Sequence, residues 1–289
     1  MFERKDLLEI LEAKLSFDRN LRRHSILVPL VMLSISLFMT GCGTLNNGRG
    51  WGQDAIYPIE QKRITRAAYH AFFDLQTLIP AAGALVFTVD HYDKNVSHWA
   101  TSHHPIFGSE NSAEQASEYL LYTLQAETFV TMLATPSGKD PKDWTYSKAK
   151  GLGVELGAEL VTLGTTSLLK SAIDRSRPDG DSKSFPSSHS SNAFSSTTLS
   201  NRNLNSIQMP ENIRMPLQIG NILLATGVGW ARVEAGKHFP SDVLAGAALG
   251  HFLSAFIYDA FIGLPEHRRW GIYVEPNKHG ATIGLSFGF

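Results

Sequence analysis

The chain has 289 residues, of which 43% are hydrophobic and 18% are charged. This length fits one substantial domain with additional segments, and the low charged fraction indicates a large buried core or contact with a membrane. The net charge of -1 argues against a chain-wide basic field that binds nucleic acid, and the single cysteine excludes an internal disulfide and a multi-cysteine metal site.

Residues 1–41 are typical of an export signal. Arginines precede an almost entirely apolar stretch, residues 26–39, and small residues lead into Cys42. The Met-Thr-Gly-Cys segment that ends at Cys42 resembles a bacterial lipobox, although Met39 and Thr40 are not its usual residues. The alternative is an uncleaved membrane anchor, because the apolar run is close to the ~17-residue lower limit for a spanning helix.

Lipidation of Cys42 is the preferred interpretation, and it predicts a protein anchored in the bacterial envelope with its domain in the periplasm. Asp after the cysteine commonly retains lipoproteins at the inner membrane, whereas Gly43 stands there in this chain. We therefore expect the outer membrane rather than the inner membrane. Residues 42–63 are Gly-, Asn- and polar-rich, which predicts a lipidated N-terminus followed by a flexible tether.

A helical domain is predicted over residues 64–264. Apolar residues recur at helical spacing in five stretches, which are residues 64–90, 112–134, 146–173, 216–231 and 242–262. Residues 91–113 are predicted to form a polar loop. Polar residues interrupt the apolar stretches, so we expect the bundle to lie outside the bilayer. These interruptions are Glu155, Glu159, Asn221 and His251.

Residues 265–289 are predicted to form a β-hairpin. Residues 270–274 have the composition of a strand, residues 275–280 supply turn residues, and residues 281–289 alternate between apolar and polar. The terminal Phe289 is typical of outer-membrane barrels, but two strands cannot close a barrel. We therefore expect a hairpin packed on the helical domain. The predicted fold class is all-α, a helical bundle with a short C-terminal β-hairpin.

Three short segments carry candidate chemistry. The first runs from Lys170 to Arg177 and Pro178, the second is Phe-Pro-Ser-Ser-His at 185–189, and the third contains Arg232. Lysine and arginine side chains suit a phosphate dianion, because arginine binds two oxygens at once and lysine supplies a compact charge. Backbone N–H groups at a helix start near residue 189 would add donors for phosphate oxygens.

The third segment also contains His238 and, four residues later, Asp242. Pro240 suits the first turn of the helix that follows, which places Asp242 near the helix start. A carboxylate on the Nδ1–H of His238 would fix the tautomer and leave Nε2 as a nucleophile. His189 then remains as a second imidazole for proton transfer.

In this order and spacing, the three segments resemble the signature of the type 2 phosphatidic acid phosphatase superfamily. This superfamily includes lipid phosphatases, bacterial class A acid phosphatases and vanadium haloperoxidases. Its pattern is Lys, six residues, Arg-Pro; then Pro-Ser-Gly-His; then Ser-Arg, five residues, His, three residues, Asp. The chain matches from Lys170 to Asp242, with two departures. Ser188 stands where Gly is usual, and Ala231 stands where Ser is usual.

The resemblance implies a helical bundle and a phosphatase that needs no metal and no cofactor. It implies that His238 attacks phosphorus to form a phosphohistidine, that Asp242 orients His238, and that His189 transfers protons. The implied phosphate-binding residues are Lys170, Arg177, Ser187, Ser188 and Arg232. The expected substrate is a phosphorylated lipid or a small phosphate ester or pyrophosphate.

Two other functions stay open at this point. A vanadium-dependent haloperoxidase would use the same residues to hold vanadate, and an inactive envelope scaffold would keep the fold alone. The chain is short for a haloperoxidase, and a scaffold needs neither His189 nor His238. Other polar residues are weaker candidates for the site: His103 and His104 in the polar loop, His251 as a core residue, and Glu118 and Glu127 as partners of cations.

Overall fold

The computed structural model describes residues 41–55, 60–89, 92–263, 270–277 and 280–287. The predicted export signal, apart from Gly41, lies outside these residues. The helices within them are α2 (Gln61–Phe72), α3 (Leu75–Phe87), α4 (Tyr92–His103), α5 (Glu110–Ala134), α6 (Pro141–Ile173), α7 (Ser188–Ser206), α8 (Glu211–Glu234) and α9 (Pro240–Phe261).

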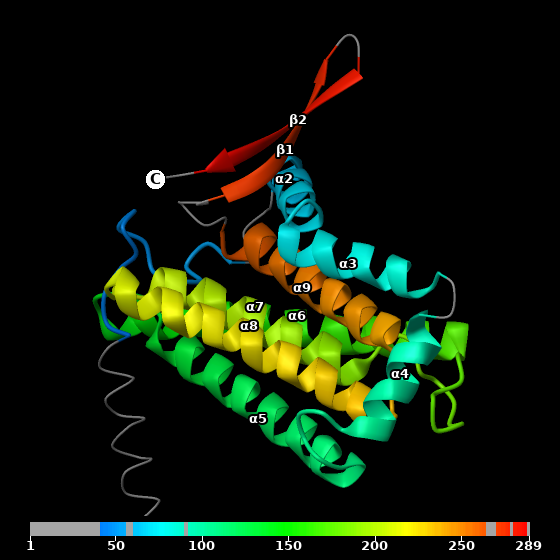
Figure 1. Cartoon of the computed structure of the whole chain (residues 1–289). Coiled ribbons are helices and arrows are strands. Elements are labelled where there is room, and N and C mark those ends of the chain that lie inside the picture. Colours follow the sequence, from blue (N-terminus) through cyan, green and yellow to red (C-terminus); the bar gives the residue numbers. More distant parts are fainter. Residues whose placement is uncertain (1–40, 56–59, 90–91, 264–269, 278–279, 288–289) are drawn as a thin grey trace, which may run out of the picture.

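Helix α7 is the central element of the bundle. It packs against α5, α6, α8 and α9, while α2 and α3 cover the outer side of α9 (Figure 1). The contact with α9 is close because Gly246 and Gly250 face the backbone of α7: a Cβ at Gly250 would lie only 2.1 Å from the carbonyl oxygen of Ser191. These glycines thus let two helices approach nearly backbone to backbone, which aligns their N-terminal ends.

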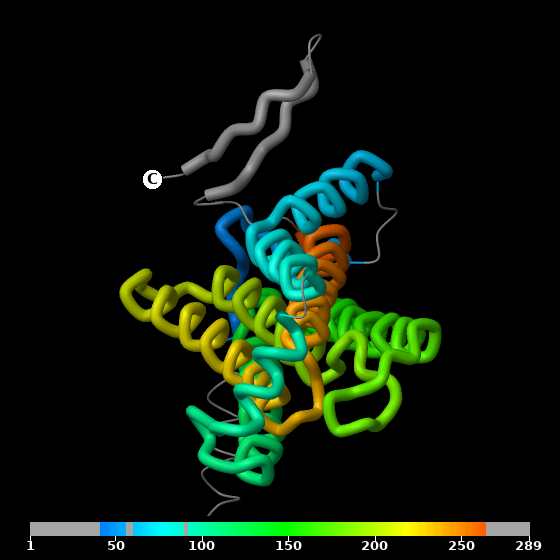
Figure 2. Tube along the Cα trace, turned by 45° about the vertical axis from the view of Figure 1, so that its right-hand side comes forward, coloured from blue at the N-terminus to red at the C-terminus, as the bar shows by residue number. Residues whose placement is uncertain are grey.

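The helix starts follow local capping chemistry. The side chains of Asp74, Ser109, Asp140 and Ser187 each accept a backbone N–H in the first turn of α3, α5, α6 and α7. Asp74 explains why the stretch 64–90, predicted as one helical pattern, forms two helices. Its capping bond starts α3 afresh, and α3 is bent by 50° from α2 (Figure 2).

The predicted polar loop 91–113 is wrong over most of its length, because it contains α4. The residues of α4 are largely polar, and only Asp93, Ser97 and Ala100 are buried. Two of these three buried residues are polar, so the helix has no apolar stripe for periodicity to reveal. Its position is set instead by polar contacts of Asp93 with other elements.

The predicted flexible tether is also corrected over residues 41–55, which pack against the helices. Trp51 is fully buried, and its Nε1–H donates to the hydroxyl of Tyr258 at 2.9 Å. Gly43 pairs with Gly138, and the indole of Trp144 donates to the carbonyl of Gly41 at 2.9 Å. One tryptophan therefore anchors a segment whose composition is otherwise typical of a linker.

The predicted fold class needs a correction at the C-terminus. The regular elements among the described residues from α2 to α9 are all helices. Strands β1 (Trp270–Asn277) and β2 (Gly280–Phe287) pair with each other antiparallel, but neither packs extensively on a helix (Figure 1). The expected hairpin packed on the domain is therefore wrong. The fold is an all-α bundle, and the two strands form no layer of it.

The polar interruptions led to the expectation of a bundle outside the bilayer, but some described helices are suited to a membrane. Helices α6 and α9 are long and apolar enough to cross a membrane, and the bent pair α2 and α3 passes the same test as one unit. The interrupting residues do not prevent this, because they point inward. Glu155 is fully buried, Asn221 and His251 are nearly so, and Glu159 is partly buried against Ser196.

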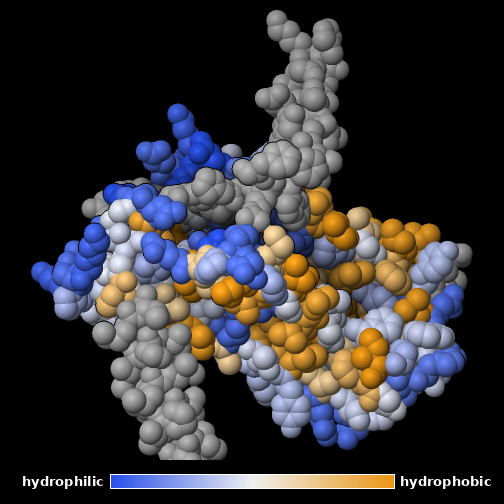
Figure 3. All heavy atoms as spheres, turned by 60° about the vertical axis from the view of Figure 1, so that its left-hand side comes forward, coloured by the Kyte–Doolittle hydropathy of each residue, from blue (hydrophilic) through white to orange (hydrophobic). Residues whose placement is uncertain are grey.

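An uncharged surface surrounds the middle of the bundle. The side chains exposed on α3, along α5 over 119–130, on α6 over 153–168 and on α8 over 213–226 include none that is charged. Large apolar residues dominate this surface; Leu160 and Leu168 are 68% and 73% exposed. Figure 3 shows such apolar residues gathered across the body. We call this surface the apolar belt. An exposed apolar surface of this extent is unusual for a protein that contacts only water.

Candidate active site

The three predicted segments meet at one end of the bundle, where α6 and α8 end and α7 and α9 begin (Figure 1). The backbone N–H of Ser187 donates to the carbonyl of Asp242 at 2.9 Å, and that of His238 donates to the carbonyl of Arg232 at 3.2 Å. The ammonium of Lys170 reaches the carbonyl of Lys183 at 2.7 Å. The contact between Ser187 and Asp242 thus joins the second and third segments through the backbone, and Lys170 connects the first segment to the loop that leads to the second.

Two of the predicted cations act on both predicted histidines, and the third acts on one of these cations. Besides burial, the charges of Lys170 and Arg232 both lower the pKa of His189 and that of His238. Besides burial, the charge of Arg177 in turn lowers the pKa of Lys170. Arg232 is 5% exposed and donates to the Ser117 hydroxyl at 3.2 Å. Such a concentration of buried positive charge is costly unless an anion compensates it.

Several buried donors at this end lack a partner. Among the residues that the structure describes, the Nε of Arg177, the Nε of Arg232 and the Nδ1 of His238 are buried without a hydrogen bond. The Nδ1 of His238 faces Asp242. Buried polar atoms are normally satisfied, so the unpaired Nε atoms of the two arginines indicate a place for a group with several acceptors. A tetrahedral oxyanion supplies such acceptors.

His238 and Asp242 lie as the sequence predicts, on either side of the start of α9. Pro240 occupies the first turn of that helix, and Asp242 follows it. The Nδ1 of His238 is 3.8 Å from Oδ2 of Asp242, longer than a hydrogen bond, so the two groups form a close electrostatic pair. Burial lowers the pKa of His238 to about 4, and Lys170 and Arg232 add to that effect while Asp242 opposes it.

The second histidine has a partner on α5. The Nε2 of His189 lies 2.8 Å from Oε1 of Glu118. Burial and the charge of Arg232 lower the pKa of His189, whereas Glu118 opposes this change. The hydrogen bond with His189 in turn lowers the pKa of the Glu118 carboxyl. Glu118, expected only as a partner of cations, therefore pairs with an imidazole.

The two departures from the superfamily signature occupy different surroundings. Ser188 opens α7 directly after Ser187, whose side chain caps that helix. The first N–H groups of a helix have no carbonyl partner within it, and they carry the positive end of its dipole. Ala231 is fully buried on α8, where a serine hydroxyl would need its own partner.

Arg175, Ser184 and Asp93 belong to the same cluster, although they were not predicted. Arg175 donates to Asp242 at 2.7 Å and to Asp93 at 2.9 Å, and the hydroxyl of Ser184 donates to Asp242. Arg175 lies within the first predicted segment, so its charge was a usable signal. Asp93 had none, because it lies on α4 far from the signature.

The remaining candidate residues lie outside this cluster. His103 ends α4 and stacks on Trp99, and His104 follows it. His251 is buried on α9 and bonds to Thr198 at 2.8 Å, as expected for a core residue. Glu127 accepts from Ser200 and Asn221 on α7 and α8. These contacts assign His251 and Glu127 to the polar interior of the bundle and His103 to its surface.

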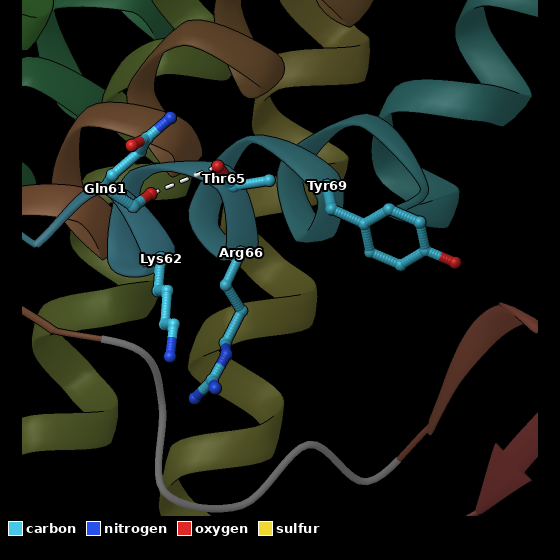
Figure 4. A pocket seen from close by; sticks show the side chains of 5 residues that line it. All are labelled: Gln61, Lys62, Thr65, Arg66 and Tyr69. Carbon is cyan, nitrogen blue, oxygen red and sulfur yellow. Dashed lines mark hydrogen bonds between the residues drawn. The ribbon is translucent and has the colours of Figure 1, made fainter.

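A surface hollow of about 540 Å³ lies along α2 and includes no predicted site residue. Figure 4 shows its side chains on successive turns of that helix, with Lys62 and Arg66 pointing to the same side. Its lining residues are Gln61, Lys62, Thr65, Arg66 and Tyr69. The clustered buried groups described above, and not this open hollow, therefore define the candidate site.

Comparisons with known proteins agree with the motifs. The sequence model of the PAP2 superfamily matches residues 152–263, which include all three segments. Lipid phosphate phosphatase 1 of Arabidopsis thaliana is 37% identical over 97 residues, which are 32% of this chain. The match spans only 30% of that protein's length.

A solved structure, the transmembrane PAP2-type phosphatidylglycerolphosphate phosphatase from Bacillus subtilis, is also similar. It shares 25% sequence identity with this chain at a TM-score of 0.44. The match covers 66% of this chain and 93% of the other.

Proposed function

We propose that this chain is a phosphatase of the PAP2 superfamily that hydrolyses a lipid-linked phosphate monoester or pyrophosphate. The observation that supports this most directly is the pair of unpaired, buried Nε atoms of Arg177 and Arg232. They belong to the same end of the bundle as two imidazoles and a lysine. Lipid phosphate phosphatase 1 of Arabidopsis thaliana, by its name, acts on lipid phosphates.

In this proposal, Lys170, Arg177 and Arg232 bind the phosphate oxygens, and Ser187 and the first N–H groups of α7 add donors. Positive groups held in place before the reaction stabilise the charge that moves onto the oxygens in the transition state. The positive charge that binds the substrate comes from these site residues, since the net charge of the whole chain is only -1.

His238 is the proposed nucleophile. With a pKa of about 4, its imidazole is neutral near pH 7 and has a lone pair available. Nδ1 faces Asp242, so Nε2 attacks phosphorus and forms the N–P bond while the bond to the leaving oxygen breaks. Asp242 stabilises the positive charge that develops on the ring, and His189 donates a proton to the leaving alkoxide.

The second step regenerates the enzyme. His189, now neutral, accepts a proton from water, and the resulting hydroxide attacks phosphorus as the N–P bond breaks. Inorganic phosphate leaves, and His238 returns to its neutral form. Protons balance over the two steps, because the one that His189 gives to the alcohol is replaced by one from water.

We propose that the apolar belt seats the helical body in a membrane. The exposed, uncharged part of α6 from residue 153 to residue 168 is roughly 22 Å long at 1.5 Å per residue, a large part of the ~30 Å hydrocarbon core. The charged interior residues are then shielded from lipid by the bundle itself. A body in the membrane brings a lipid substrate to the site by lateral diffusion.

Lipidation of Cys42 is the competing mode of attachment. Cys42 lies beside the start of α6, where Gly43 pairs with Gly138, whereas Lys170 lies in the last turn of the same helix. Residues 144 and 170 are ~39 Å apart along a straight helix. A lipid on Cys42 would therefore hold the end of the bundle that is remote from the site.

The test is phosphate release by the purified full-length protein in detergent. The assay compares three lipid substrates with a soluble aryl phosphate. The lipids are dioctanoyl phosphatidic acid, phosphatidylglycerol phosphate and a polyprenyl pyrophosphate. Turnover of at least one lipid at a higher kcat/KM than the aryl phosphate supports the proposal. No phosphate release from any of them contradicts it.

A further inference from the structure

The carboxylate of Asp242 is held by groups other than His238. Asp242 is fully buried, and its Oδ1 accepts from the Nη1 of Arg175 at 2.7 Å. Its Oδ2 accepts from the backbone N–H of Phe239 at 2.8 Å and from the hydroxyl of Ser184. Three donors fix the plane of this carboxylate, so it cannot rotate to meet His238 without breaking one of them.

Arg175 is itself fixed on three sides. Its Nη2 donates to Oδ2 of Asp93 at 2.9 Å, and its Nη1 also donates to the hydroxyl of Ser241 at 2.8 Å. The guanidinium lies 4.3 Å from the centre of the Phe239 ring. A planar guanidinium can join two carboxylates in one geometry, which an ammonium cannot do.

Asp93 ties this arrangement to α4. It is 5% exposed, and it accepts from the backbone N–H of Ser241 at 2.8 Å as well as from the Ser241 hydroxyl. The start of α9 is thus held by Asp93 directly and through Arg175. No part of this set is oriented to bind the phosphate, since Arg175 directs its donors at two carboxylates and a hydroxyl.

We propose that Arg175 and Asp93 are positioning residues that hold the Asp242 carboxylate beside the Nδ1 of His238. The proposal rests on the phosphatase function proposed above. Arg175 occupies Oδ1, which leaves Oδ2 on the side of the imidazole. When the ring becomes positively charged during attack, the carboxylate is already in place and needs no reorganisation.

The test compares Arg175→Met and Arg175→Lys with the wild type, using full-length protein and dioctanoyl phosphatidic acid in detergent micelles. We expect Arg175→Met to lower kcat about 100-fold, because a displaced catalytic group costs rate rather than affinity, with KM changed less than about threefold. Arg175→Lys should give an intermediate kcat. Asp93→Asn should lower kcat in the same way, and the double variant Asp93→Asn with Arg175→Met should be no worse than Arg175→Met alone.

Arg202→Met is the matched control, since Arg202 forms a 2.9 Å ion pair with the buried Asp259 between α7 and α9, away from the site. It should lower the thermal midpoint to a similar extent while keeping kcat within about twofold of the wild type. If Arg175→Met does not fold, kcat is measured for Asp93→Asn instead. This change keeps the size of the side chain and the bond from Arg175 to Asp242, so the variant should fold.

An unchanged kcat in a folded Arg175→Met, a raised KM at unchanged kcat, or an equal loss of kcat in Arg202→Met would each overturn the positioning role. A wild-type protein without turnover contradicts the phosphatase function instead, so the two failures are distinguishable. Strictly additive losses in the double variant would also overturn the claim that Arg175 and Asp93 act as one unit.

Discussion

The Nδ1 of His238 lies 3.8 Å from the Oδ2 of Asp242, although both side chains are buried at the start of α9. The imidazole therefore has no hydrogen-bonded carboxylate before the reaction, and its pKa of about 4 keeps it neutral. Because three donors hold the Asp242 carboxylate in place, we expect the imidazole to move the remaining distance of about 1 Å to a hydrogen bond. This should happen when the ring gains positive charge on bonding to phosphorus.

The first prediction concerns the nucleophile. His238→Ala removes the atom that attacks phosphorus, so phosphate release should fall at least about 1000-fold. Circular dichroism and the thermal midpoint should show a folded protein. His103→Ala is the control, because His103 lies at the exposed end of α4 and should retain full turnover. Near wild-type activity in folded His238→Ala would remove His238 from the mechanism.

The second prediction concerns the pH dependence set by Glu118. The Glu118 carboxylate raises the pKa of His189 against the effect of burial, so Glu118→Gln should lower that pKa. His189 must carry a proton to protonate the leaving group, and it will lose that proton at a lower pH. The basic limb of the kcat profile should therefore move to lower pH, while the acidic limb stays in place.

Glu110→Gln is the matched control for this measurement. Glu110 precedes Glu118 by two turns on α5 and lies 3.7 Å from Lys237, so it is charged but not bonded to an imidazole. Its pH profile should coincide with that of the wild type. A basic limb that moves equally in both variants, or in neither, contradicts the role given to Glu118.

The third prediction concerns metals and vanadate. Three cationic side chains supply the positive charge at the site, so turnover should survive EDTA. Vanadate should inhibit, because it adopts the five-coordinate geometry of phosphorus during transfer. Loss of activity on chelation with recovery on addition of a divalent ion would contradict the mechanism. Bromination in the presence of vanadate would favour a haloperoxidase instead.

The fourth prediction concerns the two ends of the bundle. If the apolar belt lies in a membrane, Cys42 and the site face opposite sides of it. In sealed vesicles, a membrane-impermeant maleimide should label Cys42 from one side only. In a Cys42→Ser background, Asp181→Cys on the loop after α6 should be labelled from the other side only.

The same experiment separates the two modes of attachment. Labelling of both positions from one side would place the whole body outside the bilayer. A Cys42 that resists labelling, together with an intact mass that includes acyl chains and lacks residues 1–41, would establish the lipoprotein. The free thiol of Cys42, with the mass of the unmodified chain, is the result expected for an embedded body.

The fifth prediction concerns the segment 41–55. Trp51→Ala should lower the free energy of unfolding by about 3–5 kcal/mol, because it empties a fully buried site. Trp51→Phe should cost about 1 kcal/mol more than its smaller volume explains, through loss of the bond to Tyr258. Trp99→Ala is the control, since Trp99 is 47% exposed. Equal thermal midpoints for Trp51→Ala and the wild type would instead support the interpretation of this segment as a flexible tether.

The sequence supplies the resemblance to the PAP2 superfamily, whose model matches residues 152–263, and it predicts the helical class. Six candidate site residues follow from the sequence, because the spacing within each of the three segments is a local property of the chain, and their roles stay predictions. These residues are Lys170, Arg177, His189, Arg232, His238 and Asp242. Most helices could be predicted for a similar reason, since apolar periodicity and the capping residues act within a few turns. The Glu118, Arg175 and Asp93 contacts could not, because they join α5, α6 and α4 to residues distant in the chain.

Which side of each helix faces outward depends on the packing of the helices against one another. Glu155 and Asn221 reduce the hydropathy of their stretches, yet both point into the bundle, and the outer sides of α6 and α8 are left uncharged. Two further parts could not be recognised as buried from their composition. One is Trp51 in a polar segment, and the other is the polar helix α7 at the centre of the bundle. A residue's type is known from the sequence, but whether it meets solvent, lipid or another helix depends on the packing of the whole chain.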